Sequence, residues 1–212
     1  MSREPIAGYP VNLVVEGRRC IVVGAGRVAA RKIEALLTAG ATVHVVAREL
    51  GDEVRKWADA GRLTVDLRPF TPTDLDGARL ATTATGDPAV DHQVFEAGEA
   101  RGVWVNSADD PANCSFTLMS VVRRGDLVVT IGTGGRSPAL AAWLRRRIGA
   151  DLGPEYEVLL DLLSDAREAR RAEGRSSEDP GWQRALDSGM LDLVRAGRLD
   201  DAKELLATCL SS

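Results

Sequence analysis

A short segment near the amino terminus constrains the fold of this chain more than any other feature. It joins an uninterrupted apolar run, residues 20–23, to the sequence GAGRVAA at residues 24–30. A continuous apolar run of this length is typical of a strand that is buried on both faces of a sheet. Apolar residues then recur at helical spacing from residue 28 to residue 37, and Gly40 ends the pattern. The segment therefore predicts a buried strand, a glycine-rich turn and a helix.

The same alternation of strand and helix continues through the first half of the chain. Further strands are expected over residues 42–46, 63–67, 80–83 and 103–105, and helices over residues 27–39, 53–60 and 90–100. Parallel strands need crossover helices between them, whereas antiparallel strands do not. This order therefore predicts an α/β domain with a parallel sheet.

The pattern changes near residue 109. Residues 115–122 and 127–131 are β-rich runs separated by only four residues, so they should pair as an antiparallel hairpin. A helix is expected from the loop at 133–138 to residue 148, and further helices over 156–171, 182–188, 190–195 and 200–210, with an exposed loop or helix end over 167–178. We therefore predict three domains: α/β over 1–112, a small α+β segment over 113–149 and a helical C-terminal domain over 150–212.

Composition limits the partners of the chain. Its 27 basic and 31 acidic residues leave a formal charge of −4, and only nine residues are aromatic. The negative net charge does not attract a polyanion such as DNA, and so few aromatic residues do not suffice for a surface that stacks nucleic-acid bases. Three scattered cysteines and two histidines give no metal-ligand pattern and fit a reducing compartment. No run of 18 apolar residues occurs. We expect a cytoplasmic protein that binds no resident metal, nucleic acid or membrane.

Residues 24–30 match the G-x-G-x-x-A form of the dinucleotide fingerprint. Gly24 permits the tight turn, and Gly26 lets the backbone approach a pyrophosphate at the helix amino terminus. This pattern predicts a Rossmann-like domain that binds a dinucleotide cofactor; the alternative is a tight strand–helix turn without a ligand. The expected cofactor contacts of the turn are Gly24, Ala25, Gly26, Arg27 and Val28.

Two other loops should lie at the same edge of the sheet. Arg48 and Glu49 follow the second strand, where an arginine suits the 2′-phosphate of NADP and an acid suits the ribose hydroxyls of NAD. Either residue is also explained as a solvated side chain. Thr83, Ala84 and Thr85 follow the fourth strand and are further candidate cofactor contacts, with a plain polar loop as the alternative.

An acidic loop and a basic region are the remaining candidates for chemistry. Asp109 and Asp110 follow the fifth strand, where a carboxylate suits general acid–base catalysis, although the pattern before Pro111 is also typical of an Asx turn. A second glycine-rich loop and the following helix form the densest basic region of the chain, with Arg123, Arg124, Arg136, Arg145, Arg146 and Arg147. This region indicates either an acidic small-molecule substrate or a solvated helix face.

Several segments, taken in order, resemble the precorrin-2 dehydrogenases, which include the amino-terminal module of siroheme synthases. The matching segments are YPVNL at 9–13, VVGAGRVAARK at 22–32, ATGD at 84–87, VNSAD at 105–109, SF at 115–116 and GGRSP at 134–138. The resemblance implies that precorrin-2 gives a hydride to NAD⁺ and becomes sirohydrochlorin. Some members of the family then insert Fe²⁺ as a second substrate. The resemblance also implies a homodimer formed through the segment 113–149.

The resemblance assigns roles to individual residues. The family's catalytic aspartate falls on Asp109, at the end of an Asn-x-x-Asp element. The substrate-binding residues that it implies are Asn106, Ser115, Gly134, Gly135, Arg136, Ser137 and Arg145. Cys114 stands where a small residue is usual. Two other functions remain open from the sequence: another NAD(P)-dependent oxidoreductase of an acidic substrate, and a non-catalytic nucleotide-sensing module.

Overall fold

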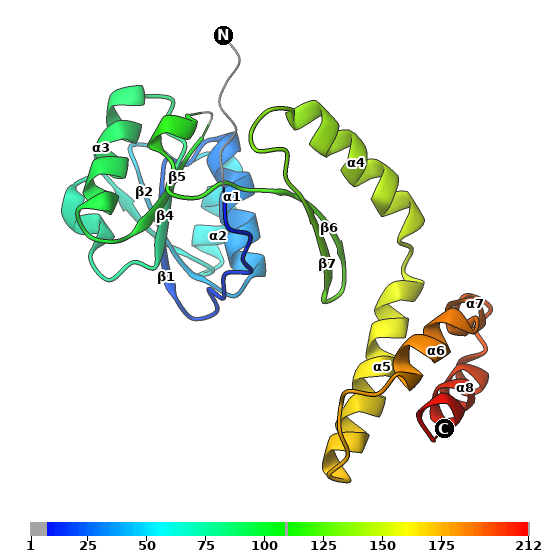
Figure 1. Ribbon diagram of the computed structural model, residues 1–212. Coiled ribbons are helices and arrows are strands. Elements are labelled where there is room, and N and C mark those ends of the chain that lie inside the picture. Colours follow the sequence, from blue (N-terminus) through cyan, green and yellow to red (C-terminus); the bar gives the residue numbers. More distant parts are fainter. Residues whose placement is uncertain (1–7, 109, 212) are drawn as a thin grey trace. The chain divides into compact units, whose positions relative to one another are not determined.

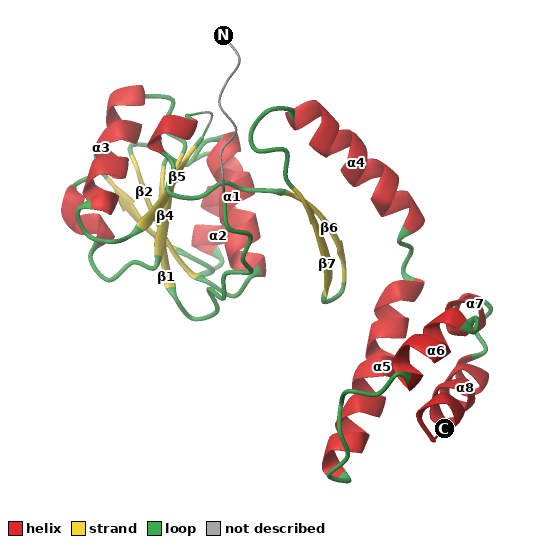
Figure 2. Ribbon diagram, viewed as in Figure 1, coloured by secondary structure: helices red, strands yellow, loops and turns green. Residues whose placement is uncertain are grey.

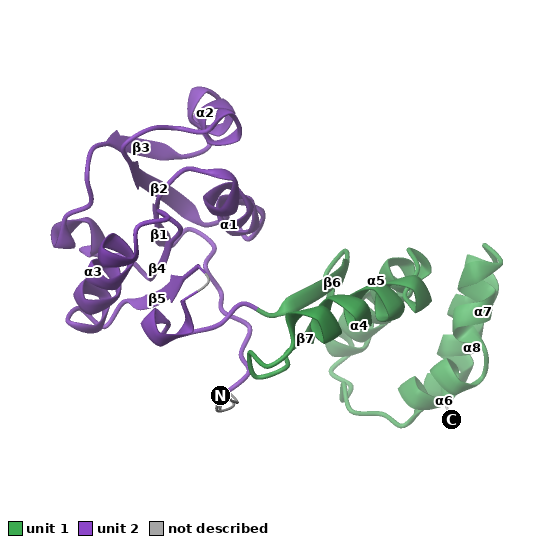
Figure 3. Ribbon diagram, turned by 90° about the horizontal axis from the view of Figure 1, so that it is seen from above, with its two compact units in different colours: residues 1–7, 119–212 green, residues 8–118 purple. Residues whose placement is uncertain are grey.

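The computed structural model describes residues 8–108 and 110–211. They form two compact units, one of Gly8–Leu118, here called the sheet unit, and one that begins at Met119, here called the helical unit (Figure 3). The boundary between them falls inside the segment 113–149, and the division into three domains stays a prediction. Each unit is described below by itself.

The sheet unit contains five parallel strands in the order β3-β2-β1-β4-β5. The strands are β1 (Arg19–Val23), β2 (Thr42–Ala47), β3 (Thr64–Leu67), β4 (Leu80–Thr83) and β5 (Trp104–Ser107), and the helices are α1 (Arg27–Thr38), α2 (Asp52–Asp59) and α3 (Pro88–Glu99) (Figures 1 and 2). The chain winds from β1 outward to β3 and then returns to the other side of β1. This reversal is the topological switch point of a doubly wound sheet, and it confirms the Rossmann-like fold predicted from the sequence.

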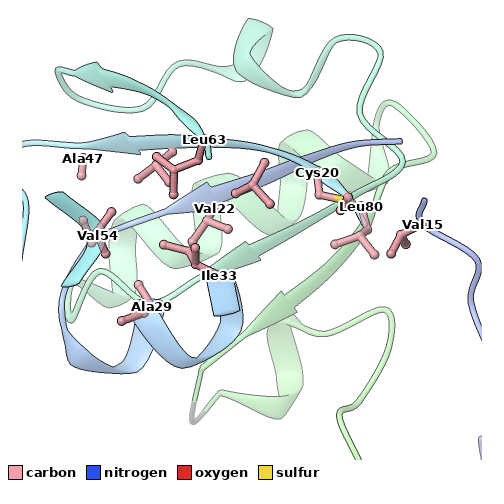
Figure 4. Packing of buried hydrophobic residues seen from close by; sticks show 14 residues of the cluster. Val15, Cys20, Val22, Ala29, Ile33, Ala47, Val54, Leu63 and Leu80 are labelled. Atoms are coloured by element: carbon pink, nitrogen blue, oxygen red, sulfur yellow. The ribbon is translucent and has the colours of Figure 1, made fainter. Parts of the chain in front are cut away.

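Both faces of this sheet are buried, which explains why β1 reads as a continuous apolar run. Val22 and Val45 face α1 and α2, where they meet Ile33 and Val54 (Figure 4). Neighbouring residues of the same strands point to the opposite face and pack in a second cluster with Leu75, Val94 and Val105; they are Ile21, Val23 and Val46. Because successive strand residues point to opposite faces, a strand between two helical layers needs an apolar residue at every position.

The chain leaves the sheet unit later than expected. After a short 3-10 turn at Pro111–Asn113, Cys114 forms an antiparallel bridge with Asn106, and the Ser115 amide donates to the Val105 carbonyl at 2.8 Å. The prediction that residues 115–122 form one hairpin strand was therefore wrong at its start. Residues 114 and 115 extend the edge of the sheet at β5, and the hairpin strand begins at Ser120.

The helical unit begins with the predicted hairpin, in which β6 (Ser120–Arg124) pairs antiparallel with β7 (Leu127–Ile131). Five helices follow: α4 (Pro138–Asp151), α5 (Glu155–Ala172), α6 (Gly181–Asp187), α7 (Met190–Arg195) and α8 (Leu199–Ser211). The last four share one apolar core around Leu159, Leu162, Met190 and Leu206. Within the described residues, no helix combines the length and the apolar character that crossing a membrane would need.

The exposed helix end and loop expected over residues 167–178 are present, except that one arginine among them is buried. Helix α5 continues to Ala172, and Arg170 is buried, with 9% of its surface exposed. Its guanidinium donates to the Asp179 carboxylate at 2.7 Å and to the Leu210 carbonyl at 2.9 Å. These contacts come from residues that are distant in sequence, so local composition does not reveal them.

Candidate functional site

The glycine-rich turn between β1 and α1 is wedged against two neighbouring strands. Gly24 has a φ of +102°, and its amide donates to the Val46 carbonyl at 2.9 Å. A Cβ atom at this position would lie 2.5 Å from the carbonyl oxygen of Ala84. Gly24 is therefore required by the protein's own packing and backbone conformation.

Gly26, in contrast, is a glycine that the protein's own packing does not require. It is the N-cap of α1 with a φ of −76°, and a Cβ atom built on it would meet nothing within 4 Å. Open space therefore lies above the first turn of α1, where free N–H groups and the helix dipole favour an anion. No acidic residue stands in this turn, all of which the structure describes. These features fit a cofactor pyrophosphate, and Arg27 is exposed beside them.

The loop after β2 is fastened to the same turn. The Gly51 amide donates to the Ala25 carbonyl at 3.1 Å, and a Cβ atom at Gly51 would lie 2.8 Å from that oxygen. Arg48 and Glu49, in this loop, are exposed and form no hydrogen bond or ion pair with any described residue. The structure thus brings both candidate ribose contacts to the glycine turn.

A cavity of about 420 Å³ opens at the carboxyl edge of the sheet. It is lined by Val28, Ala84, Gly86, Pro88, Asp91, Ala108 and Asp110. These residues come from α1, the loop after β4, α3 and the loop after β5. A cavity of this size, at the switch point of an α/β sheet, is typical of a small-molecule site. Of the predicted contacts, Val28 and Ala84 line it directly, whereas Thr83 is buried at the end of β4.

Asp91 is the cavity residue that the sequence analysis missed. It lies in the first turn of α3 and is only 6% exposed. Its Oδ1 accepts hydrogen bonds from the Thr83 hydroxyl, from the Thr85 hydroxyl at 2.7 Å and from the Thr85 amide at 3.4 Å. An acid near a helix start is ordinary in sequence. The sequence places Asp91 eight residues after Thr83, which ends a strand. This spacing indicates a contact between the two side chains only once the strand and the helix are known to pack together.

The loop that follows β5 is fixed on both sides of residue 109. Asp109 itself lies outside the described residues. Before it, the Ala108 amide donates to the Thr83 carbonyl at 2.9 Å. After it, Asp110 accepts from the Ala112 amide at 3.2 Å and from Asn113 Nδ2 at 2.7 Å, which confirms Asp110 as a turn-forming residue.

Asn106 and Cys114 brace the base of this loop. Asn106 is buried, accepts from Lys32 Nζ at 2.5 Å and donates to the Phe116 carbonyl at 3.0 Å. The Cys114 sulfur accepts from the Ser107 amide at 3.2 Å. Both side chains therefore hold the backbone that carries the candidate catalytic residue.

Ser115 is not brought into the cavity. Its hydroxyl donates to the Glu99 carboxylate at 2.7 Å, and Glu99 ends α3. Since α3 begins at the carboxyl edge of the sheet and runs back across it, its last residue lies near the opposite edge. Ser115 therefore joins α3 to the edge strand.

The other predicted substrate contacts belong to the helical unit. Gly134 and Gly135 have positive φ values of 59° and 75°, and Ser137 caps α4 by accepting from the Leu140 amide at 3.2 Å. Arg136 and Arg145 are exposed. The loop before α4 is thus a tight, glycine-dependent turn that ends at a helix amino terminus.

Two arginines of the basic region contact other parts of the helical unit. Arg124 donates from Nε to the Leu152 carbonyl and from Nη2 to the Gly149 carbonyl, each at 2.6 Å. The guanidinium carbon of Arg147 lies 5.5 Å from the centre of the Trp143 ring. The region is therefore less free to bind an anion than its composition indicates.

Comparisons with known proteins find relatives that match most of the chain. The siroheme synthase of Nitrosococcus oceani is 34% identical over 203 residues, which cover 95% of this chain and 43% of that protein. The siroheme synthase of Methylococcus capsulatus is 36% identical over 202 residues, which cover 93% of this chain and 42% of that protein. The chain thus spans less than half the length of these curated relatives.

One solved structure matches almost the whole chain. The protein described as "SirC, precorrin-2 dehydrogenase" superposes with a TM-score of 0.73 at 25% identity and covers 97% of this chain and 100% of that one. These matches confirm the resemblance on which the site residues were assigned. A family model described as "Putative NAD(P)-binding" matches residues 11–120, which is more than half of the 212 residues. This chain therefore belongs to that NAD(P)-binding family.

Proposed function

We propose that the protein oxidises precorrin-2 to sirohydrochlorin with NAD⁺, in the pathway to sirohaem. The observation that carries this proposal is the cavity at the switch point of the sheet. It lies between the end of α1 that follows the glycine turn, where Gly26 leaves open space, and residues Ala108 and Asp110 of the loop after β5. The likeness to a precorrin-2 dehydrogenase over the length of the chain supports the choice of substrate.

Different loops of the sheet unit contact different parts of the cofactor. When bound, the nicotinamide ring supplies the hydride acceptor. Gly24, Ala25, Gly26, Arg27 and Val28 hold the pyrophosphate; Arg48 and Glu49 face the adenosine ribose, and Thr83, Ala84 and Thr85 form the floor beside the ring. Because the cavity walls at Val28, Ala84, Pro88 and Ala108 are apolar, they exclude water from the reacting centre.

Asp109 is proposed as the proton acceptor. The oxidation removes two electrons and two protons from precorrin-2; one proton leaves with both electrons as hydride, and the other needs a base. A carboxylate on the loop after β5 is suited to that step. Asn106 holds the backbone of this loop through Lys32 and Phe116, and the Ser115–Glu99 hydrogen bond holds the following segment against α3.

The loop before α4 is proposed as the binding site for the substrate's carboxylates. Gly134, Gly135 and Ser137 present a tight turn at a helix amino terminus, and Arg136 and Arg145 add exposed positive charge. Arginine pairs with carboxylates through two parallel hydrogen bonds, which suits a tetrapyrrole bearing acetate and propionate groups. Changing either arginine to alanine should raise KM more than it lowers kcat, and the effect should weaken at high salt.

An assay with purified protein, precorrin-2 and NAD⁺ tests the reaction. The visible spectrum reports tetrapyrrole oxidation, and the near-ultraviolet absorbance of NADH reports reduction of the cofactor. Asp109→Asn should still bind NADH but lose turnover, whereas Asp59→Asn, which removes the same charge at the exposed end of α2, should keep it. Full turnover by Asp109→Asn would contradict the role given to Asp109.

The same preparation separates the rival functions. Dinucleotide binding without oxidation of any tetrapyrrole favours a nucleotide-sensing module, and oxidation of another acidic substrate favours a different oxidoreductase. Addition of Fe²⁺ to sirohydrochlorin, against a control without protein, tests the chelatase step that the resemblance implies for some family members.

We propose a cytoplasmic location, supported by three cysteines that form no disulfide within the described residues.

We also propose a homodimer formed through the segment 113–149. Val122 of the hairpin packs on Gly149 of α4, but Val121 and Val128 are 41% and 40% exposed on the other face. A two-stranded sheet is only marginally stable alone. Leu140 and Trp143 of α4 are also exposed. This incomplete layer is what a second copy of the chain would cover.

A further inference from the structure

Asp91 has one carboxylate oxygen that the fold does not use. All three hydrogen bonds to this side chain go to Oδ1, from Thr83 and Thr85. Oδ2 has no partner among the described residues, although the residue is 94% buried and lines the cavity. Three side-chain nitrogen or oxygen atoms in the described part of the chain are shut off from solvent and lack a partner: Thr82 Oγ1, Ser107 Oγ and Arg170 Nε. Asp91 Oδ2 also lacks a partner but is not shut off from solvent, and because Asp91 lines the cavity, this oxygen opens into it.

The order of the strands decides which end of a dinucleotide reaches this oxygen. The loop at residues 48–51, suited to the adenosine ribose, follows β2 on one side of β1. The glycine turn follows β1 itself, and the cavity lies over the ends of β4 and β5 on the other side. Because a dinucleotide extends across the switch point with its pyrophosphate at the glycine turn, its nicotinamide end comes to the cavity.

The side chains that line the cavity are mostly apolar and include few acceptors. Its two described carboxylates are Asp91 and Asp110, and both oxygens of Asp110 are engaged by Ala112 and Asn113. The nicotinamide ring carries one hydrogen-bond donor group, the NH₂ of its carboxamide. Among the described carboxylates that line the cavity, Asp91 Oδ2 is the oxygen that remains free to accept it.

We propose that Asp91 binds the carboxamide NH₂ of the nicotinamide and so fixes which face of the ring is presented to the substrate. This inference rests on the dinucleotide binding proposed above and does not depend on the substrate. Asp91 is then a cofactor-binding residue, held in its rotamer by Thr83 and Thr85. Proton transfer remains with Asp109.

A pair of cofactors that differ in this one group tests the inference. In 3-acetylpyridine adenine dinucleotide, a methyl group replaces the NH₂ while the carbonyl is kept. Isothermal titration calorimetry of the full-length protein should show that NAD⁺ binds about tenfold or more tightly than this analogue, as expected for a hydrogen bond to a charged group. Binding is measured without substrate, so the result does not require turnover.

Asp91→Asn should abolish the preference. The Thr85 amide and the two hydroxyls keep the amide oxygen at the Oδ1 position, which leaves an NH₂ donor toward the cavity. That donor suits the acetyl carbonyl, and it equally suits the carboxamide oxygen of NAD⁺ once the carboxamide turns, so the ratio of the two affinities should fall about tenfold, toward one. Asp87→Asn is the matched control, because Asp87 caps α3 without lining the cavity and asparagine caps as well.

The outcomes separate this inference from the proposed function. An unchanged affinity ratio in Asp91→Asn, with the variant folded by circular dichroism, overturns the inference alone. Failure of the unaltered protein to bind either dinucleotide overturns both. An altered ratio in Asp91→Asn supports the inference even where precorrin-2 is not oxidised, a result that would overturn only the choice of substrate.

Discussion

Two glycines separated by one residue have different reasons to be glycine. Gly24 has a positive φ and no room for a Cβ atom beside Ala84, whereas Gly26 has an ordinary φ and open space. The first requirement comes from the fold and the second from a ligand. Substitution of Gly24 should therefore mainly lower the stability of the protein, and substitution of Gly26 should mainly weaken cofactor binding.

Alanine substitutions test this division. Gly24→Ala should lower the free energy of unfolding by about 2 kcal/mol or more, because it adds a strained backbone to a clash. Gly26→Ala should change it by about 0.5 kcal/mol or less but weaken NADH binding at least tenfold, since the methyl group fills the pyrophosphate site. Urea unfolding and NADH fluorescence titration measure the two effects. Equal loss of stability in both variants would contradict this account.

A buried carboxylate at the β3–β4 connection makes stability depend on pH. Asp74 is 6% exposed, accepts from Arg68 at 2.6 and 2.9 Å and accepts from the Thr71 amide at 2.8 Å. Burial alone would raise the pKa of Asp74, but the hydrogen bonds from Arg68 and Thr71 outweigh it and hold the pKa below its ordinary value.

The lowered pKa of Asp74 fixes the sign of the pH effect. Its stabilisation is fully present above the ordinary aspartate pKa of about 3.9 and is lost as the pH falls through the lower value of the folded state. Asp74→Asn should cost about 2 kcal/mol at pH 6, and the gap from the unaltered protein should narrow at pH 3. Urea unfolding at both pH values measures this. Asp76→Asn, at an exposed ion pair with Arg101, should cost less than about 0.5 kcal/mol at either pH.

At the scale of the element, α4 depends on a residue from the hairpin. The last carbonyls of a helix have no partner within it. Arg124 donates to two carbonyls at this end, those of Gly149 and Leu152. A cation there also offsets the negative end of the helix dipole. Arg124 therefore ties β6 to the end of α4.

Replacement of Arg124 should loosen this element without affecting the sheet unit. Arg124→Ala should lower the stability of the helical unit by about 1–2 kcal/mol, because it leaves two carbonyls without a charged donor. Arg123→Ala, one residue earlier and exposed, should have an effect within about 0.5 kcal/mol. Hydrogen exchange at amides of α4 and β6 reports the loss locally. Equal protection in both variants would show that Arg124 does not hold the helix end.

At the scale of the whole molecule, the helical unit exposes Val121 and Val128 on one face of its hairpin. Charge placed there should oppose association of two copies without disturbing the described cores. Val121→Lys with Val128→Glu should shift the sedimentation profile from dimer to monomer, since both side chains are exposed within one chain. Glu34→Lys, at an exposed position of α1 outside the segment 113–149, is the control and should leave the sedimentation profile unchanged. A monomeric unaltered protein would contradict the proposed dimer.

The sequence itself was sufficient for the order of the elements. Strands buried on both faces leave uninterrupted apolar runs, and amphipathic helices leave a regular stripe, so β1 to β5 and the helices between them were recognised from local periodicity. The glycine turn was recognised for the same reason, because its requirements are backbone conformation and close approach within a few residues.

Tertiary structure decided the contacts that join distant parts of the chain. Asp91 meets Thr83 only because α3 packs against the end of β4, Ser115 reaches Glu99 instead of the cavity, and Arg124 spans to the end of α4. Such contacts are set by packing across elements, for which one sequence has no periodic signal. The sequence by itself thus determined the strands, the helices and the glycine turn, because these depend on local pattern. The tertiary structure alone decided the order of the strands and which polar side chains face the cavity, because both depend on how the elements pack.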